Sequence, residues 1–125
     1  MNLVDSSGWL EYFANGKNAM FFAEPLESTT KLIVPSLCIF EVFKKTLQQR
    51  GENAALQAVS LMQKTEIIPL DFPLSLNAAK LSADFTLPMA DSIILATARA
   101  YKATLWTQDA DFKKFEDVKF IERKA

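Results

Sequence analysis

Histidine is absent from this 125-residue sequence. Its absence excludes a Ser-His-Asp triad, a Cys-His pair, an HExxH zinc site and any histidine general base. Any chemistry that the chain performs must therefore rely on carboxylates, hydroxyls, lysines, or a metal ion held by oxygen ligands.

Cysteine is scarce, and long apolar runs do not occur. The single Cys38 excludes an intrachain disulfide framework and a zinc cluster of thiolates. No stretch approaches the roughly 20 consecutive apolar residues of a membrane span. The first residues, MNLVDSS, contain no basic segment and do not resemble a signal peptide. We therefore expect a cytoplasmic protein without a membrane partner.

A strong excess of charge is also missing, because 14 basic residues are balanced by 15 acidic ones. The sequence as a whole lacks the basic character common in nucleic-acid-binding domains, although local patches matter more than the sum. Half of the residues are hydrophobic, which is enough for a core at this length. The length itself predicts a single domain over residues 1–125.

Only three glycines punctuate the chain, so we infer helices from apolar periodicity and strands from short β-branched runs. Expected strands cover 2–5, 31–35, 66–70, 103–107 and 117–121. Expected helices cover 8–16 (closed by Gly16), 18–28 (interrupted near Pro25), 37–50 (capped by Ser36 and ended by Gly51), 52–64, 73–85 and 89–102, with a turn or short helix over 109–115. This alternation predicts a three-layer α/β fold whose central, mostly parallel sheet of about five strands is flanked by helices.

Acidic residues fall where such a sheet binds ligands, beyond the carboxyl ends of its strands. Asp5 ends the first expected strand, and Asp109 lies just past the fourth. Glu41 lies one turn into the helix after the second strand, and Asp91 in the first turn of another helix. Four neighbouring buried carboxylates would raise one another's pKa and cost several kcal/mol unless a multivalent cation neutralised them. Oxygen ligands favour Mg²⁺ or Mn²⁺ over zinc.

Each acid also has a purely structural interpretation. Asp5 could cap the first helix, and Asp109 could form an Asx turn. Asp91 could be a favourable charge at a helix N-terminus. Glu41 could pair with a lysine one turn along its helix, although apolar residues flank it on both sides. The four positions together make the metal site the stronger interpretation.

Four motifs together resemble those of PIN-domain proteins. They are VDSSGWLEYF, CIFEVFKK, PMADSIILATA and TLWTQDADF, and they cover essentially the whole chain. The short length is similar to that of the VapC toxins of toxin–antitoxin pairs. The resemblance implies a PIN-like fold and a Mg²⁺- or Mn²⁺-dependent ribonuclease that acts on RNA, tRNA among the candidate substrates.

The resemblance also assigns roles to residues. The family's acidic quartet maps onto four catalytic candidates: Asp5, Glu41, Asp91 and Asp109. Asp5 and Asp91 are expected as direct metal ligands, Asp109 as a ligand acting directly or through water, and Glu41 as the group that positions or deprotonates the attacking water. Expected supporting residues are Ser6 and Thr107, which match the family, and Asp111, which is close enough to Asp109 to reach the metal.

The same resemblance implies a homodimer and a cognate antitoxin whose C-terminal segment covers the acidic pocket. Aromatic residues on the first two helices either line the groove for that segment or belong to the core; these are Trp9, Tyr12, Phe13, Phe21 and Phe22. Candidate RNA contacts, which could equally be solvated faces, are Lys44, Lys45, Lys113 and Lys114.

Other functions fit less well. A receiver domain needs paired acids after the first strand, and a haloacid-dehalogenase-type phosphatase needs Asp-x-Asp there, whereas this chain has DSS. Two alternatives stay open: a non-catalytic binding module of the PIN fold, and a nuclease of the same fold that acts on DNA.

Overall fold

A single parallel sheet of five strands in the order β3-β2-β1-β4-β5 organises the chain. The structure, a computed structural model, describes residues 1–125. The strands are β1 (Asn2–Val4), β2 (Leu32–Pro35), β3 (Glu66–Ile68), β4 (Thr104–Thr107) and β5 (Val118–Phe120). Every expected strand is present, and the predicted parallel α/β sheet is confirmed.

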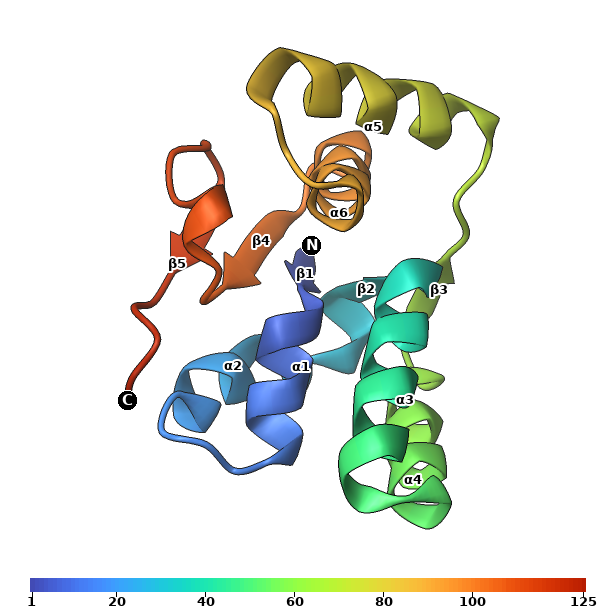
Figure 1. The fold of residues 1–125 in the computed structure, drawn as a ribbon, viewed down its shortest axis with the longest axis vertical. Helices are drawn as coiled ribbons and strands as arrows, with labels where there is room; N and C mark the ends of the chain where they lie inside the picture. The colour runs from blue at the N-terminus through green and yellow to red at the C-terminus, as the bar shows by residue number, and fades with distance from the viewer.

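Six α-helices connect the strands. They are α1 (Ser6–Phe13), α2 (Ala19–Leu26), α3 (Ser36–Arg50), α4 (Glu52–Met62), α5 (Phe72–Phe85) and α6 (Met89–Ala100), with short 3₁₀ turns η1 (Thr29–Lys31) and η2 (Ala110–Phe112). Figure 1 shows α5 and α6 on one face of the sheet and α1 to α4 on the other, which is the expected three-layer arrangement.

Several helix ends differ from the sequence prediction by one to three residues, and the differences at α1 and α3 concern their caps. Helix α1 begins at Ser6 rather than at residue 8, because Asp5 caps it, and it ends at Phe13 rather than at Gly16. Asn15 takes the left-handed conformation after the helix, with φ of 51°. Ser36 was expected as a cap, but it is the first residue of α3 and supplies no capping hydrogen bond. The predicted stop at Gly51 is confirmed.

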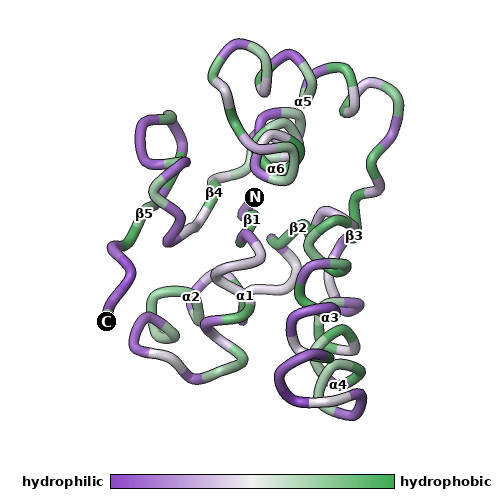
Figure 2. The backbone as a smooth tube through the Cα atoms, in the orientation of Figure 1, coloured by the Kyte–Doolittle hydropathy of each residue, from purple (hydrophilic) through white to green (hydrophobic).

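The core lies along the inner strands. Leu3 and Val4 of β1, Ile33 of β2 and Leu105 of β4 have no exposed surface, as expected for parallel strands covered on both faces. In Figure 2, β2 and α6 are largely hydrophobic, whereas the segment after β5 is hydrophilic. None of the helices combines the length and apolar character that crossing a bilayer requires.

The strand order reverses direction between β1 and β4. From β1 the chain moves outward to β2 and β3, and it returns to place β4 on the other side of β1. The loops after β1 and β4 therefore diverge, and they leave a crevice at the carboxyl edge of the sheet where open α/β folds bind ligands.

Candidate active site

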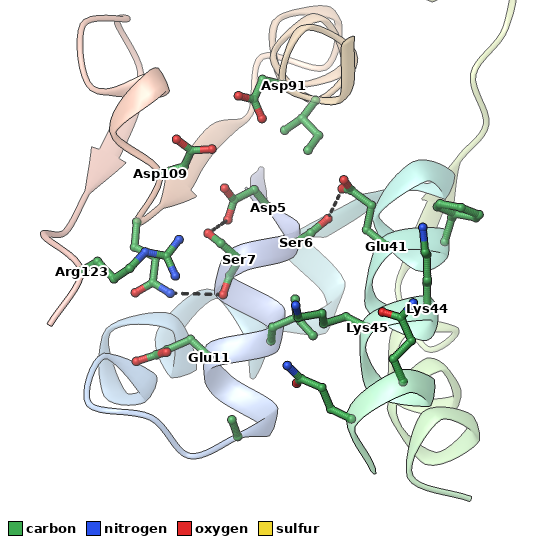
Figure 3. Close-up of a pocket in the computed structure, with 17 residues that line it drawn as sticks. Asp5, Ser6, Ser7, Glu11, Glu41, Lys44, Lys45, Asp91, Asp109 and Arg123 are labelled. Carbon is green, nitrogen blue, oxygen red and sulfur yellow. Dashed lines mark hydrogen bonds between the residues drawn. The ribbon is translucent and has the colours of Figure 1, made fainter. Parts of the chain in front are cut away.

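A pocket of about 750 Å³ opens at this carboxyl edge. Its walls come from one side of α1, the exposed side of α3, the start of α6, the loop after β4 and the segment after β5 (Figure 3). Five carboxylates line it: Asp5, Glu11, Glu41, Asp91 and Asp109. All four acids of the predicted quartet thus lie in one pocket.

Asp5 is buried at the end of β1, with 3% of its surface exposed. Its Oδ1 accepts hydrogen bonds from the Gly8 backbone N–H (3.0 Å) and the Ser7 hydroxyl (2.8 Å), and its Oδ2 accepts one from the Thr107 hydroxyl (2.6 Å). The capping interpretation is therefore correct as well. Burial raises the pKa of Asp5 to about 6, although these three donors act to lower it.

Thr107 links Asp5 to Asp109. Its hydroxyl donates to Asp5 and accepts the Asp109 backbone N–H at 2.9 Å. Asp109 Oδ1 in turn accepts the backbone N–H of Asp111 at 2.9 Å, which is the Asx turn expected at this position. The turn orients the Asp109 carboxylate at the rim of the pocket, and the Thr107 hydroxyl lies between the two acids.

Asp91 lies in the first turn of α6, which has no side-chain cap. Its pKa is raised to about 7, first by burial and then by the negative charge of Asp109. A hydrogen bond with Asp111 and the charges of Asp111 and Asp5 raise it further. Whereas protein donors surround Asp5, other acids surround Asp91.

Three acids form the tightest group in the pocket region. One carboxylate oxygen from each of Asp91, Asp109 and Asp111 lies within 4.8 Å of the other two. An all-oxygen donor set of this charge fits a hard divalent cation such as Mg²⁺ or Mn²⁺. Sequence analysis expected Asp5 as a direct ligand and Asp111 as a supporting residue, whereas the close group contains Asp111, and Asp5 lies deeper in the same pocket.

Glu41 projects from α3 toward the start of α1 (Figure 3). Its Oε1 accepts a hydrogen bond of 2.6 Å from the Ser6 hydroxyl, so a residue of α1 orients this carboxylate of α3. The ammonium group of Lys44, a candidate partner on the same helix, lies over the Phe40 ring, 5.8 Å from its centroid. A supporting role for Ser6 stays a prediction.

The four candidate RNA-binding lysines divide between two places. Lys44 and Lys45 line the acidic pocket. Lys113 and Lys114 line a different hollow, of about 430 Å³, beside α5 and η2. There the Lys114 ammonium lies 5.7 Å from the centroid of the Phe85 ring. The structure therefore brings only the α3 pair to the quartet.

The aromatic residues of α1 and α2 belong mainly to the core. Trp9 and Phe22 are buried, with 3% and 0% of their surfaces exposed. Tyr12, Phe13 and Phe21 are half-buried and pack against the same core. None of the five lines the acidic pocket.

Several residues of the pocket wall were not predicted from the sequence, among them Gln108 and Arg123. Gln108 is buried, and its amide donates to the Ser7 carbonyl at 3.4 Å. Its place between Thr107 and Asp109 was the available signal. Arg123 follows the last strand by several residues, and no motif marks it.

Taken together, the topology and the pocket define an α/β protein that gathers acids at the switch point of a parallel sheet. The model of the PIN domain matches residues 3–118, and the chain therefore belongs to the PIN-domain family. Among curated proteins, no sequence match is found.

Solved toxin–antitoxin proteins share this fold. A toxin–antitoxin complex from Klebsiella pneumoniae matches with a TM-score of 0.78 and 22% identity, over 94% of this chain and 95% of that one. VapC20 of Mycobacterium tuberculosis, described as a toxin that cleaves the sarcin–ricin loop, matches with a TM-score of 0.79 and 16% identity, over 94% and 98%. VapBC2 of Rickettsia felis, bound to a promoter DNA fragment, matches with a TM-score of 0.75 and 14% identity, over 97% of both chains.

Proposed function

We propose that this chain is a metal-dependent endoribonuclease and the toxin of a VapBC-type pair. The observation that carries the proposal is the close group of Asp91, Asp109 and Asp111, of which Asp91 and Asp109 line a pocket together with Asp5 and Glu41. Such a concentration of carboxylates is unfavourable by itself and becomes favourable when a divalent cation binds.

Asp91, Asp109 and Asp111 would hold Mg²⁺ or Mn²⁺. The carboxylate of Asp5, deeper in the pocket, would add negative charge near the ion. When bound, the cation would lower the pKa of a water molecule and offset charge on the reacting phosphate. Since a hard cation needs ionised ligands, the raised pKa of Asp91 would fall on binding.

The chain's own residues orient the reaction. Glu41, fixed by the Ser6 hydroxyl, lies on the α3 side of the pocket, where it can accept a proton from the attacking water. Asp5 is fixed by three donors and acts as a rigid negative support. With no histidine in the chain, carboxylates must perform any acid–base step.

The toxin proposal also names partners. The solved relatives in complexes with antitoxins support a cognate antitoxin that would cover the acidic pocket. A homodimer and a cytoplasmic location complete the proposal. Gel filtration with light scattering tests the dimer, and a pull-down with the protein encoded by the adjacent reading frame tests the antitoxin.

Cleavage of a mixed tRNA pool tests the activity. Purified protein is incubated with Mg²⁺, with Mn²⁺ or with EDTA, beside the variants Asp91→Asn and Asp84→Asn. Asp84 is an exposed acid of α5 outside the pocket, so its substitution controls for charge. We expect metal-dependent cutting that Asp91→Asn reduces by about a thousandfold or more, within the range of lost electrostatic stabilisation, and that Asp84→Asn leaves unchanged.

Three outcomes would contradict the proposal. Equal cutting by the wild type and by Asp91→Asn would indicate a contaminating nuclease. Metal-dependent cutting of a matched DNA oligonucleotide in preference to RNA would assign the fold to DNA cleavage. Folded protein that cuts neither, in any metal, would favour the non-catalytic binding module.

A further inference from the structure

The charges around the pocket are divided in space. Besides its five carboxylates, the pocket is lined by three cations: Lys44 and Lys45 from α3, and Arg123 from the segment after β5. In Figure 3 the lysines and Arg123 lie on opposite sides of the pocket, with the start of α1 between them. A polyanion that crossed the acids would therefore meet positive charge on both sides.

Hydrogen bonds fix the backbone that carries Arg123. The Ile121 backbone N–H donates to the Thr107 carbonyl at 3.0 Å, which extends the β4–β5 pairing past the end of β5. The Glu122 carbonyl accepts from the Asn18 side-chain amide at 3.0 Å. The two residues before Arg123 are thus held, and its side chain starts from a defined point.

Asn18 is itself well placed for this role. It is 1% exposed, and its side-chain amide also donates to the Gln108 side-chain oxygen at 2.9 Å. Its backbone N–H donates to the Glu11 carboxylate at 2.8 Å. One buried residue is therefore hydrogen-bonded to α1, to the loop after β4 and to the segment of Arg123.

Arg123 remains exposed although it lines the pocket. Glu11, an acid of the same pocket, already accepts a backbone N–H from Asn18. A guanidinium group carries donors in a planar fork that matches two oxygens of a phosphate. A divalent cation would neutralise the central acids, but flanking phosphates would still need cations of their own.

We propose that Arg123 binds a backbone phosphate of the nucleic-acid strand on the side of the cleavage site opposite Lys44 and Lys45. Arg123 would thereby set the path of the strand across the acids. This inference rests on the proposed function, because it assumes that a nucleic-acid strand occupies the pocket, but it does not depend on whether the strand is RNA or DNA.

Binding of labelled strands tests the proposal. The parent is the Glu41→Gln protein, which lacks the proposed proton acceptor, keeps the close group of acids and is expected not to cut. Arg123→Gln, Arg123→Lys and Lys124→Gln are added to it one at a time. Lys124 is the neighbouring exposed cation and does not line the pocket, so it is a matched control for charge. Fluorescence anisotropy gives the affinity for a 20-nucleotide RNA and for the same DNA sequence at several salt concentrations, with Mg²⁺ present.

We expect Arg123→Gln to weaken binding by about tenfold, as for the loss of a charged hydrogen bond. The slope of log affinity against log salt should flatten by about 0.7, the value for one phosphate contact on a single strand. Arg123→Lys should restore the slope but only part of the affinity, and Lys124→Gln should change both much less. Equal effects of Lys124→Gln and Arg123→Gln would overturn the proposal, because they would indicate general attraction by the segment.

Cleavage separates this inference from the proposed function. In the otherwise wild-type protein, Arg123→Gln should raise KM and leave kcat within about twofold, as for a lost ground-state contact. Faster cutting by Arg123→Gln at low Mg²⁺ would mean that the guanidinium competes with the cation, and would overturn the inference while leaving the nuclease intact. Binding of DNA alone, with the expected Arg123 dependence, would overturn the RNA function and support the inference. No binding of either strand by the parent would overturn the inference, whatever the cleavage assay gives.

Discussion

The two halves of the acidic pocket are neutralised in different ways. In the inner half, Asp5 receives hydrogen bonds from three protein donors. In the outer half, Asp91 is close to Asp109 and Asp111, and its pKa is raised first by burial and then by these acidic neighbours. The comparison indicates that Asp5 stabilises the fold through its hydrogen bonds. The outer acids, by contrast, need a bound cation to offset their charge.

Breaking the inner half should have the largest effect on stability. A Cβ on Gly8 would lie 2.4 Å from a Val4 methyl and 2.7 Å from the Phe22 ring, and both side chains are fully buried. We expect Gly8→Ala to lower the free energy of unfolding by about 3 kcal/mol, as for overpacking. Urea denaturation measures it.

Gly16→Ala is the matched control for that substitution. The three atoms nearest to its Cβ all belong to the end of the Glu11 side chain, which can shift at the cost of its hydrogen bond with the Asn18 backbone N–H. The loss should therefore be clearly smaller than at Gly8. Equal losses at both glycines would mean that the close approach of α1 to β1 does not cause the loss of stability in Gly8→Ala.

Removing one acid from each half compares them directly. Asp5→Ala removes the cap of α1 and leaves the buried Thr107 hydroxyl without its acceptor, so we expect a loss of about 2 kcal/mol. Asp91→Ala removes like-charge repulsion and should leave the metal-free protein equally stable or more stable. Denaturation in EDTA at pH 7.5 tests both, and a larger loss at Asp91 than at Asp5 would reverse our interpretation of the halves.

Adding the cation should act on the outer half alone. Mg²⁺ at ten times its Kd would stabilise the folded protein by about 1.4 kcal/mol, seen as a rise in Tm. Asp91→Asn should abolish that rise, because it removes a ligand from the close group. The Asp84→Asn protein serves as the control and should respond to Mg²⁺ as the wild type does.

The smallest expected effect is a pH dependence of the metal-free protein. The folded-state pKa values of Asp5 and Asp91 are raised to about 6 and about 7, so the folded protein binds more protons than the unfolded chain near these values. The free energy of unfolding should therefore fall as the pH rises from about 6 to about 8, by roughly 1 kcal/mol once the partial exposure of Asp91 is allowed for. Saturating Mg²⁺ should reduce or remove this slope in thermal melts, and a metal-free stability that rises over this range would contradict the pKa directions.

Much of this arrangement was predictable from the sequence, because the carboxyl ends of parallel strands meet at one edge of the sheet, where ligands bind. Asp5 and Asp109 were found because each follows a short β-branched run. Glu41 and Asp91 were found because each is an acid in an apolar helix. The helix boundaries were less predictable, since the start of α1 at Ser6 depends on an Asp5 hydrogen bond that the sequence suggested only as an alternative.

Other features depend on three-dimensional contacts that the sequence does not encode locally. The membership of Asp111 in the close group depends on the Asx turn at Asp109, which reverses the chain toward α6. Arg123 reaches the pocket because Asn18, over a hundred residues earlier in the chain, holds the Glu122 carbonyl. No periodicity in sequence marks a contact of that kind.

The Thr107 hydroxyl has only one proton to give, and Asp5 receives it. The same oxygen accepts the Asp109 backbone N–H, so it has nothing left to donate to the Asp109 carboxylate. One hydrogen atom thus makes the two acids unequal, with Asp5 satisfied by the protein and Asp109 left with lone pairs to offer.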